Sequence, residues 1–405
     1  MVRTNRSSFR LPTHLLGVVL ALAGCSSGGT GKQGAPPDTA SPRDSGIPPT
    51  HTGDTGSSLA PFDAALAADL QAALQAYVDD AGVAGLALAV RMPDTEPLVL
   101  AVGMADRDAE VPLALDDRHC IASITKTFTA ELILQLVDDG ALGLDDALTD
   151  HVDVLDNDDG ITIRHLLQHT AGVPEYTAAR AFLAASDHPW TDTELMALIA
   201  DAERVHPPGE GWSYSNSHYV LLGMVAEAVV GVSWADQVRE RHLVALGLDD
   251  TEVPSDDWGD IVQTYYGAHV LDDLVSPSGI GAAGNMTATV ADLAAWGEAF
   301  GRGDLLSADT FASQQESRTM IARGFAWYGL GMMMVGDALD DPELELGHNG
   351  AFNGSAGWVG YRPSRGTTLA LLGNTWRRTG TTVDYQYPLT WSRDLWALIE
   401  AAHPR

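Results

Sequence analysis

The chain has 405 residues, 45% of them hydrophobic, which is enough for one large or two ordinary domains with a sizeable core. Its formal net charge of −32, without any basic patch in the sequence, argues against a nucleic-acid partner, because phosphates would repel such a surface. The only cysteines are Cys25 and Cys120, so lipidation of Cys25 would leave no internal disulfide.

The N-terminus carries the pattern of an export signal. Three arginines precede an apolar run over residues 15–22, which is too short to span a bilayer. The run ends in Leu22-Ala23-Gly24-Cys25, which resembles the lipobox of bacterial lipoproteins. We therefore expect residues 1–24 to be a signal peptide and Cys25 to carry lipid after cleavage. The alternative is an ordinary secretory peptide with an accidental cysteine, and both interpretations predict export.

The next segment separates this signal from the folded part. Residues 25–58 are dominated by Gly, Ser, Thr, Pro and Asp and show no apolar periodicity. This composition predicts a flexible tether between a lipid anchor and a folded domain over residues 59–405. Ser26 follows the cysteine, as in lipoproteins that are sorted to the outer membrane. We therefore expect a protein anchored by lipid in the cell envelope, in the outer membrane.

The folded region begins and ends with patterns that predict a sheet. Apolar residues at helical spacing predict a helix from Phe62 to about Gly82, and alternation predicts paired strands at 86–90 and 98–102. Helical patterns dominate from residue 141 to about 300 and predict a helical insertion. A hairpin over 355–361 and 367–374 precedes a closing helix. These elements predict an α/β fold of the α+β type, whose antiparallel sheet uses both ends of the chain and is flanked by helices.

Ser123 and Lys126 form the first chemical motif. The apolar spacing after them predicts a buried helix that ends near Gly140, so both side chains lie on one face of its first turn. The only lysines are Lys32, in the predicted tether, and Lys126. Burial would lower the pKa of Lys126, and a neutral amine could take the proton of Ser123 and make it a nucleophile. The alternative is a helix cap followed by a solvated lysine.

Tyr214-Ser215-Asn216 forms a second motif on a loop just before a predicted helix that ends at Gly231. Tyr214 could move protons, and Asn216 could orient the nucleophile and a substrate amide. The alternative is a packed tyrosine followed by a helix-capping asparagine.

A third motif, His348-Asn349-Gly350-Ala351, precedes the final hairpin. In an extended segment His348 and Gly350 share a face, and a glycine there would let a substrate backbone approach closely. The alternative is a turn that leads into a strand.

Together the three motifs resemble the active site of serine β-lactamases and penicillin-binding proteins, in the branch of class C β-lactamases and D-alanyl-D-alanine carboxypeptidases with their esterase-like members. The resemblance covers roughly residues 60–400 and includes the stretches 163–172, 284–287 and 328–331.

This resemblance implies a five-stranded antiparallel sheet with a site at its junction with a helical region. Ser123 would be acylated, Lys126 and Tyr214 would exchange protons, and Asn216 would hold the acyl amide. His348 would stand where relatives carry lysine. The backbone N–H groups of Ser123 and Ala351 would form the oxyanion hole, without metal or cofactor.

Two departures bear on the substrate. No Glu-x-x-Leu-Asn stretch of the class A type is present, so deacylation would depend on Tyr214 or its neighbours. Asn349 and Ala351 stand where relatives that bind a carboxylate often carry a hydroxyl. We therefore expect a monomeric serine hydrolase of small esters or amides, with D-amino-acid peptides or peptidoglycan fragments as candidates. A β-lactamase or carboxypeptidase proper remains an alternative.

Two rival functions are weighed against this one. His165 and His169 have the spacing of zinc ligands on a helix, but Leu166 occupies the place of the glutamate in His-Glu-x-x-His. A non-catalytic binding or sensor domain would not need an intact Ser123, Lys126 and Tyr214, and measurable turnover would exclude it.

Overall fold

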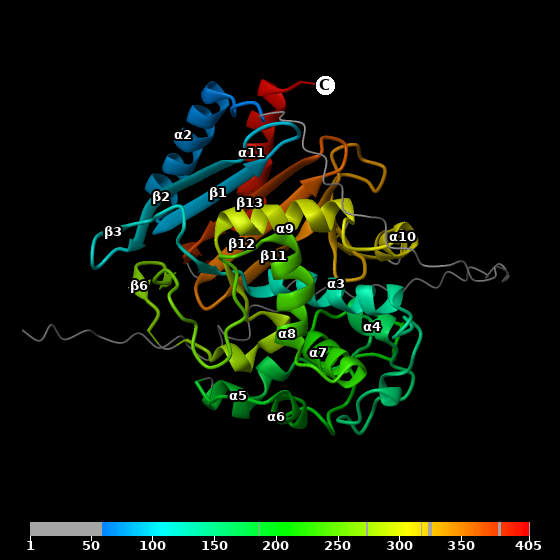
Figure 1. Cartoon of the computed structure of the whole chain (residues 1–405). Coiled ribbons are helices and arrows are strands. Elements are labelled where there is room, and N and C mark those ends of the chain that lie inside the picture. The colour runs from blue at the N-terminus through cyan, green and yellow to red at the C-terminus, as the bar shows by residue number, and fades with distance from the viewer. Residues whose placement is uncertain are drawn as a thin grey trace, which may run out of the picture.

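The computed structural model describes residues 59–185, 187–272, 274–316, 318–322, 326–379 and 382–404. The predicted signal peptide, the tether and Cys25 lie outside these residues. Figure 1 shows a sheet in the upper half of the molecule and a helical region below it.

The main sheet is antiparallel throughout, and its described strands lie in the order β3-β2-β1-β13-β12-β11-β10-β9-β8. Five long strands form its centre, as the family resemblance implied. They are β2 (Leu98–Asp106), β1 (Gly85–Arg91), β13 (Thr367–Gly373), β12 (Ser355–Arg362) and β11 (Glu345–Phe352). Short strands extend both edges, namely β3 (Val111–Pro112), β10 (Met333–Val335), β9 (Ala326–Tyr328) and β8 (Thr319–Ala322).

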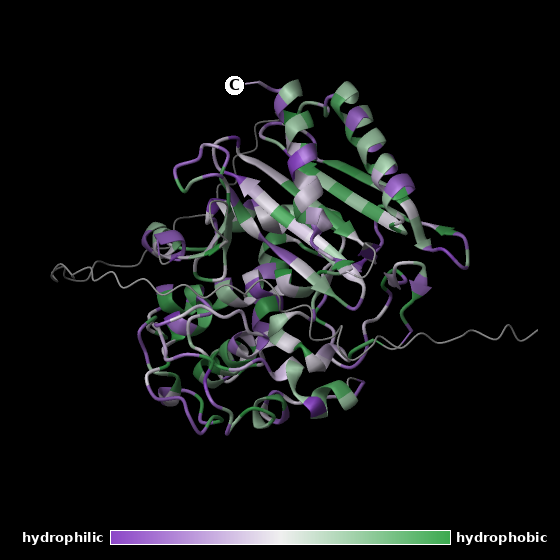
Figure 2. Cartoon of the chain, turned by 180° about the vertical axis from the view of Figure 1, so that it is seen from behind, coloured by the Kyte–Doolittle hydropathy of each residue, from purple (hydrophilic) through white to green (hydrophobic). Residues whose placement is uncertain are grey.

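Two helices from opposite ends of the described chain cover one face of this sheet. They are α2 (Ala64–Ala81) and α11 (Tyr387–Ala402), and α2 ends at Gly82 in the left-handed conformation. Apolar residues of both helices pack with residues of β1 and β13 in one hydrophobic core. Figure 2 shows hydrophobic and hydrophilic stretches alternating along the helices, as expected when one side is buried.

The other face of the sheet carries α9 (Val290–Arg302), and the remaining helices lie beyond it (Figure 1). These are α3 (Thr125–Asp138), α4 (Ile163–Leu167), α5 (Arg180–Ala184), α6 (Asp192–Ala197), α7 (Asn216–Val230), α8 (Trp234–Val238) and α10 (Ala308–Glu316). Short strands that the sequence analysis did not predict also occur here. They are β4 (His119–Cys120), β7 (Thr287–Ala288), β5 (Tyr265–Tyr266) and β6 (His269–Val270), and the last two join β14 (Thr375–Thr379) and β15 (Thr382–Asp384) in a second sheet.

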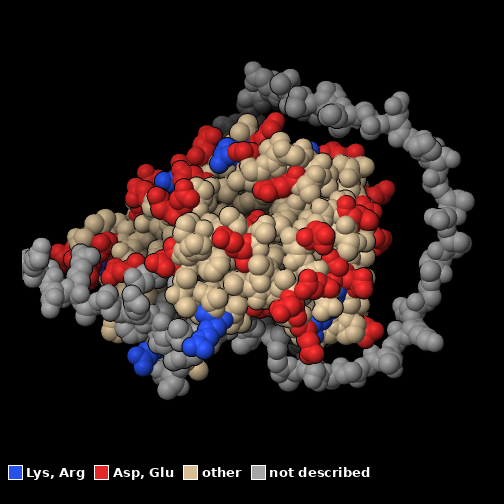
Figure 3. Space-filling model, turned by 90° about the horizontal axis from the view of Figure 1, so that it is seen from below, with Lys and Arg blue, Asp and Glu red and all other residues tan. Residues whose placement is uncertain are grey.

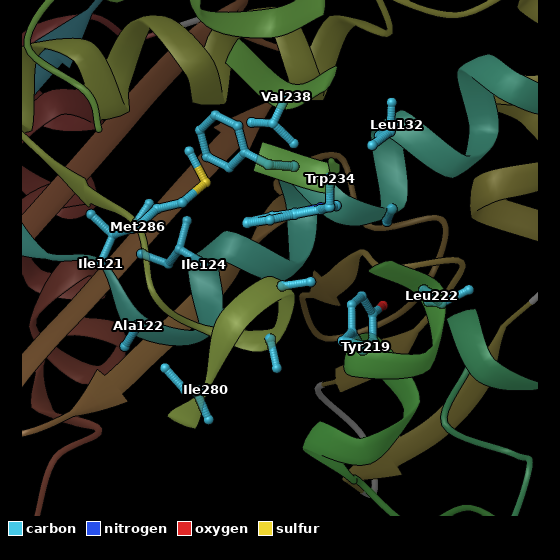
Figure 4. Close-up of a cluster of buried hydrophobic side chains, with 14 of the residues drawn as sticks. Ile121, Ala122, Ile124, Leu132, Tyr219, Leu222, Trp234, Val238, Ile280 and Met286 are labelled. Atoms are coloured by element: carbon cyan, nitrogen blue, oxygen red, sulfur yellow. The ribbon is translucent and has the colours of Figure 1, made fainter. Parts of the chain in front are cut away.

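A second hydrophobic core joins the sheet to the helical region. It contains Ile121, Ile124 and Met286 near the start of α3, packed with Trp234 and Val238 of α8 (Figure 4). Burial on this scale fixes the segment around Ser123 in place, because buried apolar side chains are close-packed and cannot shift independently.

The surface of the helical region is acidic. Figure 3, which views the molecule from below, shows many Asp and Glu side chains and few Lys or Arg on this face. Among the described residues no single helix is long and apolar enough to cross a membrane. The helical segments 216–230 and 234–244 are long and apolar enough only when they are taken together, and the chain bends by 82° between them.

Candidate active site

Ser123 is placed by a tight turn at the junction between the sheet and the helical region. It lies in a 3₁₀ turn over Ala122–Ile124 that leads directly into α3. Ser123 therefore lies just before the helix, whereas the sequence analysis placed it in the first helical turn. Ala122 has a φ of 50°, an uncommon conformation for a residue with a Cβ. From residue 119 to 134 every residue except Ser123 is buried. The turn therefore exposes the one hydroxyl that could act as a nucleophile here.

Lys126 lies completely inside the protein, with 0% of its surface exposed. Its Nζ is 3.2 Å from Oγ of Ser123, 2.7 Å from Oδ1 of Asn216 and 2.7 Å from the carbonyl oxygen of Ala283. Burial lowers the pKa of Lys126 to about 7, although the negative charge of Glu175 opposes the shift. A large fraction of this amine is therefore neutral near pH 7.

Tyr214 joins this pair. Its ring centroid lies 4.9 Å from Nζ of Lys126 and 4.3 Å from the ring centroid of His169. Burial raises the pKa of Tyr214 above its ordinary value, while a hydrogen bond with Ser123 opposes the rise. The phenol is therefore protonated near pH 7 and can donate a proton, whereas Lys126 can accept one.

Asn216 is the first residue of α7, and its side chain bridges Lys126 and Glu175. Oδ1 accepts a hydrogen bond from Lys126, and Nδ2 donates to Oε1 of Glu175 over 3.3 Å. The helix cap is Ser215 rather than Asn216. Asn216 also lines the pocket above Ser123, where its second Nδ2 hydrogen could meet a substrate carbonyl.

The third motif lies on β11, not in a turn. His348 is completely buried, its Nε2 lies 3.0 Å from the hydroxyl of Tyr328, and its Nδ1 lies 2.5 Å from the carbonyl oxygen of Asn349. Burial, together with the charge of Lys126, lowers the pKa of His348 to about 3. His348 is therefore neutral at physiological pH.

The other three residues of this motif occupy different surroundings. Ala351 lines the pocket with Ser123, whereas Asn349 is partly exposed and is not among the lining residues. A Cβ on Gly350 would clash with the carbonyl oxygen of Ile121. The protein's own chain approaches Gly350 at this point, because β11 runs against the turn that holds Ser123. The approach of a substrate backbone to Gly350 stays a prediction.

The pocket above Ser123 contains about 520 Å³ of empty space, part of it open to solvent. Apolar side chains form much of its wall, and none of its lining residues is charged. Besides Ser123, Asn216 and Ala351, the lining residues are Thr177, Phe182, Ile280, Gly284, Phe352, Asn353 and Trp376.

Sequence reasoning assigned no part in the active site to several residues around Lys126. Glu175 contacts Asn216, and Tyr328 contacts His348. His169 and His218 share a hydrogen bond of 2.9 Å between their Nδ1 atoms. His169 and Tyr328 lie in the stretches 163–172 and 328–331 that resemble relatives, which was the available signal for them.

The zinc alternative fails on local geometry. Helix α4 ends at Leu167, and His169 has a φ of 60°, so it does not continue the helix that carries His165. Nδ1 of His165 accepts a hydrogen bond from the backbone of Thr162, while His169 faces His218. Among the described residues no group of three or more His, Cys, Asp or Glu could hold a metal ion.

The fold is that of a family of serine hydrolases. Comparison with known proteins agrees, because the Beta-lactamase family model matches residues 70–387. The chain belongs to this β-lactamase family.

Relatives within the family include both penicillin-binding proteins and amidases. Penicillin-binding protein 4 of Amycolatopsis lactamdurans is 30% identical over 318 residues, 72% of this chain and 81% of that protein. The D-amino acid amidase from Ochrobactrum anthropi SV3 superimposes with a TM-score of 0.75 at 25% identity, over 84% of this chain and 99% of the amidase. A D-stereospecific amidohydrolase from Streptomyces sp. gives 0.68 at 30% identity, over 83% and 98%.

Some curated relatives match over a shorter segment. Penicillin-binding protein 4* of Bacillus subtilis and protein flp of Staphylococcus aureus each match over 37% of this chain. The matched part spans only 34% of the first protein and 30% of the second.

Proposed function

We propose that this protein hydrolyses small amides and esters through an acyl-enzyme formed on Ser123, with Lys126 as the general base and Tyr214 as the general acid. The favoured substrates carry an apolar acyl group and no carboxylate next to the scissile bond. Amides and esters of apolar D-amino acids are the class we favour.

The observation that carries the proposal is the set of three contacts around Nζ of Lys126. A neutral amine has two N–H groups and one lone pair. The Ala283 carbonyl and Oδ1 of Asn216 can only accept hydrogen bonds, so they take the two N–H groups. The lone pair then faces Oγ of Ser123 at 3.2 Å, within the reach required of a general base.

The reaction follows from these positions. Oγ of Ser123 attacks the carbonyl carbon while its proton passes to Lys126. The backbone N–H groups of Ser123 and Ala351 would stabilise the oxyanion. When the bond to the leaving group breaks, Tyr214 protonates that group and regains a proton from Lys126. Water then attacks the acyl ester, gives a proton to the neutral Lys126, and Oγ of Ser123 leaves and recovers that proton.

The surroundings of the site disfavour a substrate that carries a carboxylate next to the scissile bond. A carboxylate in the pocket would meet no cation among the described lining residues, and His348 is neutral and turned towards Tyr328. A well-placed donor to an anion contributes on the order of 1.5–3 kcal/mol, so its loss slows acylation roughly 10- to 100-fold. The names of the two amidase relatives support amides of D-amino acids.

The test compares kcat/KM for D-phenylalanine amide, L-phenylalanine amide, a short-chain aryl ester and a chromogenic cephalosporin, in the wild type and in Ser123→Ala. We expect turnover of the ester and of the D-amide, with the cephalosporin at least about 10-fold slower. Ser123→Ala should lose all activity and fluorophosphonate labelling while its thermal unfolding stays normal. Faster turnover of the cephalosporin than of ester and amide would overturn the substrate assignment in favour of a β-lactamase.

A further inference from the structure

Glu175 lies beside the site on a segment that is rigidly held. Its Oε1 accepts a hydrogen bond of 3.0 Å from the backbone of Thr177 and so caps the turn Tyr176–Ala178. Tyr176 is buried and donates to the carbonyl oxygen of Gly279 over 2.7 Å, and Oγ of Ser217 donates to that of Pro174 over 2.6 Å. The Glu175 carboxylate is therefore fixed against the start of α7.

Both carboxylate oxygens of Glu175 contact Asn216. Oε2 accepts from the backbone N–H of Asn216 at 2.5 Å, and Oε1 accepts from its Nδ2 at 3.3 Å. The two ends of a carboxamide have nearly the same shape but opposite hydrogen-bonding character. Because an ionised carboxylate can only accept, it selects the orientation that points Nδ2 towards Glu175 and Oδ1 towards Lys126.

This orientation matters for catalysis. With Oδ1 facing Lys126, the amine must donate to it and keeps its lone pair for Ser123. A reversed Asn216 would present Nδ2 to the amine and attract that lone pair away from Ser123. We propose that Glu175 is a positioning residue, which fixes the side chain of Asn216 and through it the direction in which Lys126 accepts a proton. This inference rests on the proposed function.

Glu175 also acts on Lys126 through its charge. The groups that face or interact with Lys126 are Ser123, the rings of Tyr214 and Tyr219, Glu175, and the histidines His169, His218 and His348. Burial keeps the pKa of each of these histidines below its ordinary value, so they are neutral. Glu175 is the anion in this set, and it raises the pKa of Lys126 against the effect of burial. Removing its charge should therefore lower that pKa.

The sequence offers a direct way to measure this effect. Lysine labelled with carbon-13 at Cε gives only two resonances, from Lys32 and Lys126, and Lys32→Arg assigns them. In the full chain Lys126 should titrate near pH 7, and Glu175→Gln should shift its titration to lower pH. Glu210→Gln is the matched control, because Glu210 is exposed on the loop before Tyr214 and its loss changes the net charge equally. An unchanged Lys126 titration in Glu175→Gln overturns the electrostatic part of the proposal.

Kinetics test the positioning part. Glu175→Gln should lower kcat roughly 10- to 100-fold with little change in KM, and the acid limb of its pH profile should move to lower pH. Glu175→Asp keeps the charge but shortens the side chain, so it should leave the acid limb near its wild-type position while kcat still falls. Wild-type kcat in both variants overturns the positioning role.

The two proposals fail differently. If Ser123→Ala keeps full activity, the proposed function is wrong, whereas the lysine titration still reports whether Glu175 acts on Lys126. If Ser123→Ala is inactive but the Glu175 variants match the wild type in titration and kcat, only the present inference is wrong.

Discussion

Gly350 of β11 passes so close to the carbonyl oxygen of Ile121 that no side chain fits between them. This contact joins the central sheet to the turn that holds Ser123. The next residue of the same strand, Ala351, lines the pocket. The relative position of the nucleophile and the predicted oxyanion hole therefore depends on the absence of a Cβ at residue 350.

Gly350→Ala should for this reason damage both stability and activity. The added methyl group meets backbone rather than a flexible side chain, and overpacking of this kind costs about 1–3 kcal/mol. We expect a lower denaturation midpoint and a fall in the rate of Ser123 labelling. Asn349→Ala, on the same strand but partly exposed, should change stability by no more than about 0.5 kcal/mol. Normal labelling kinetics in Gly350→Ala would show that the contact does not position the site.

The pH dependence of kcat/KM should report Lys126. Because the base must be neutral and its pKa is about 7, activity should rise with pH through neutrality and fall about tenfold per unit below it. The pKa of His348 is about 3, so His348 cannot produce this limb. A limb near pH 4 instead would contradict the assignment of Lys126 as the base.

Lys126→Arg is the companion experiment. A guanidinium remains protonated at every accessible pH and cannot take the proton of Ser123. We expect kcat/KM to fall about 10²- to 10⁴-fold, without recovery up to pH 10. Activity retained by this variant would transfer the role of base to Tyr214 or His348.

Glu131, which lies away from the active site, should make the stability of the fold depend on pH. It is completely buried on α3, and only its Oε2 has a partner, Nε2 of Gln314 at 3.4 Å. Burial raises the pKa of Glu131 from 4.5 to about 8. The folded state binds this proton more tightly than the unfolded state, so the protonated carboxyl group adds to the free energy of unfolding. This contribution is complete below pH 4.5 and is lost as pH rises through about 8.

Urea unfolding of the wild type and of Glu131→Gln at pH 5 and pH 9 tests this prediction. The wild type should lose on the order of a few kcal/mol relative to the variant over that interval, because glutamine has no proton to lose. Parallel pH dependence in the two proteins would contradict a neutral, buried Glu131.

The long elements could be predicted from the sequence because their apolar periodicity extends over several turns or pleats. The stripe that starts at Phe62 predicted α2, and the two segments of the final hairpin predicted β12 and β13. The short edge strands β8, β9 and β10 could not be predicted, because three or four residues are too few to display alternation. Their strand conformation comes from pairing with neighbouring strands.

At the site, the sequence revealed residue types but not their neighbours. The motifs predicted Ser123, Lys126 and Tyr214 as catalytic residues, and the structure places the three side chains close together. The role of Glu175 could not be found, because a glutamate on a loop resembles any solvated acid until its contact with Asn216 is known. The left-handed conformation of His169 likewise has no signature in the sequence.

The lipid anchor stays a prediction that the N-terminal sequence carries. The full-length protein should partition into the detergent phase after Triton X-114 extraction, whereas Cys25→Ser should remain in the aqueous phase. Ser26→Asp should relocate the protein from the outer to the inner membrane if the outer-membrane expectation holds. Recovery of the wild type only as an unlipidated soluble protein would contradict the lipobox interpretation.

His348→Lys should shift the preference of the enzyme towards anionic substrates. It places an amine where the resemblance implies a lysine in related active sites, so the ratio of cephalosporin to ester turnover should rise roughly 10- to 100-fold. The new charge also lies near Lys126 and lowers its pKa further, so the acid limb for the ester should move to lower pH. His348→Gln is the control, because its amide can still accept a hydrogen bond from Tyr328 without adding charge. If both variants give the same ratio of cephalosporin to ester turnover, charge at residue 348 does not determine the choice of substrate.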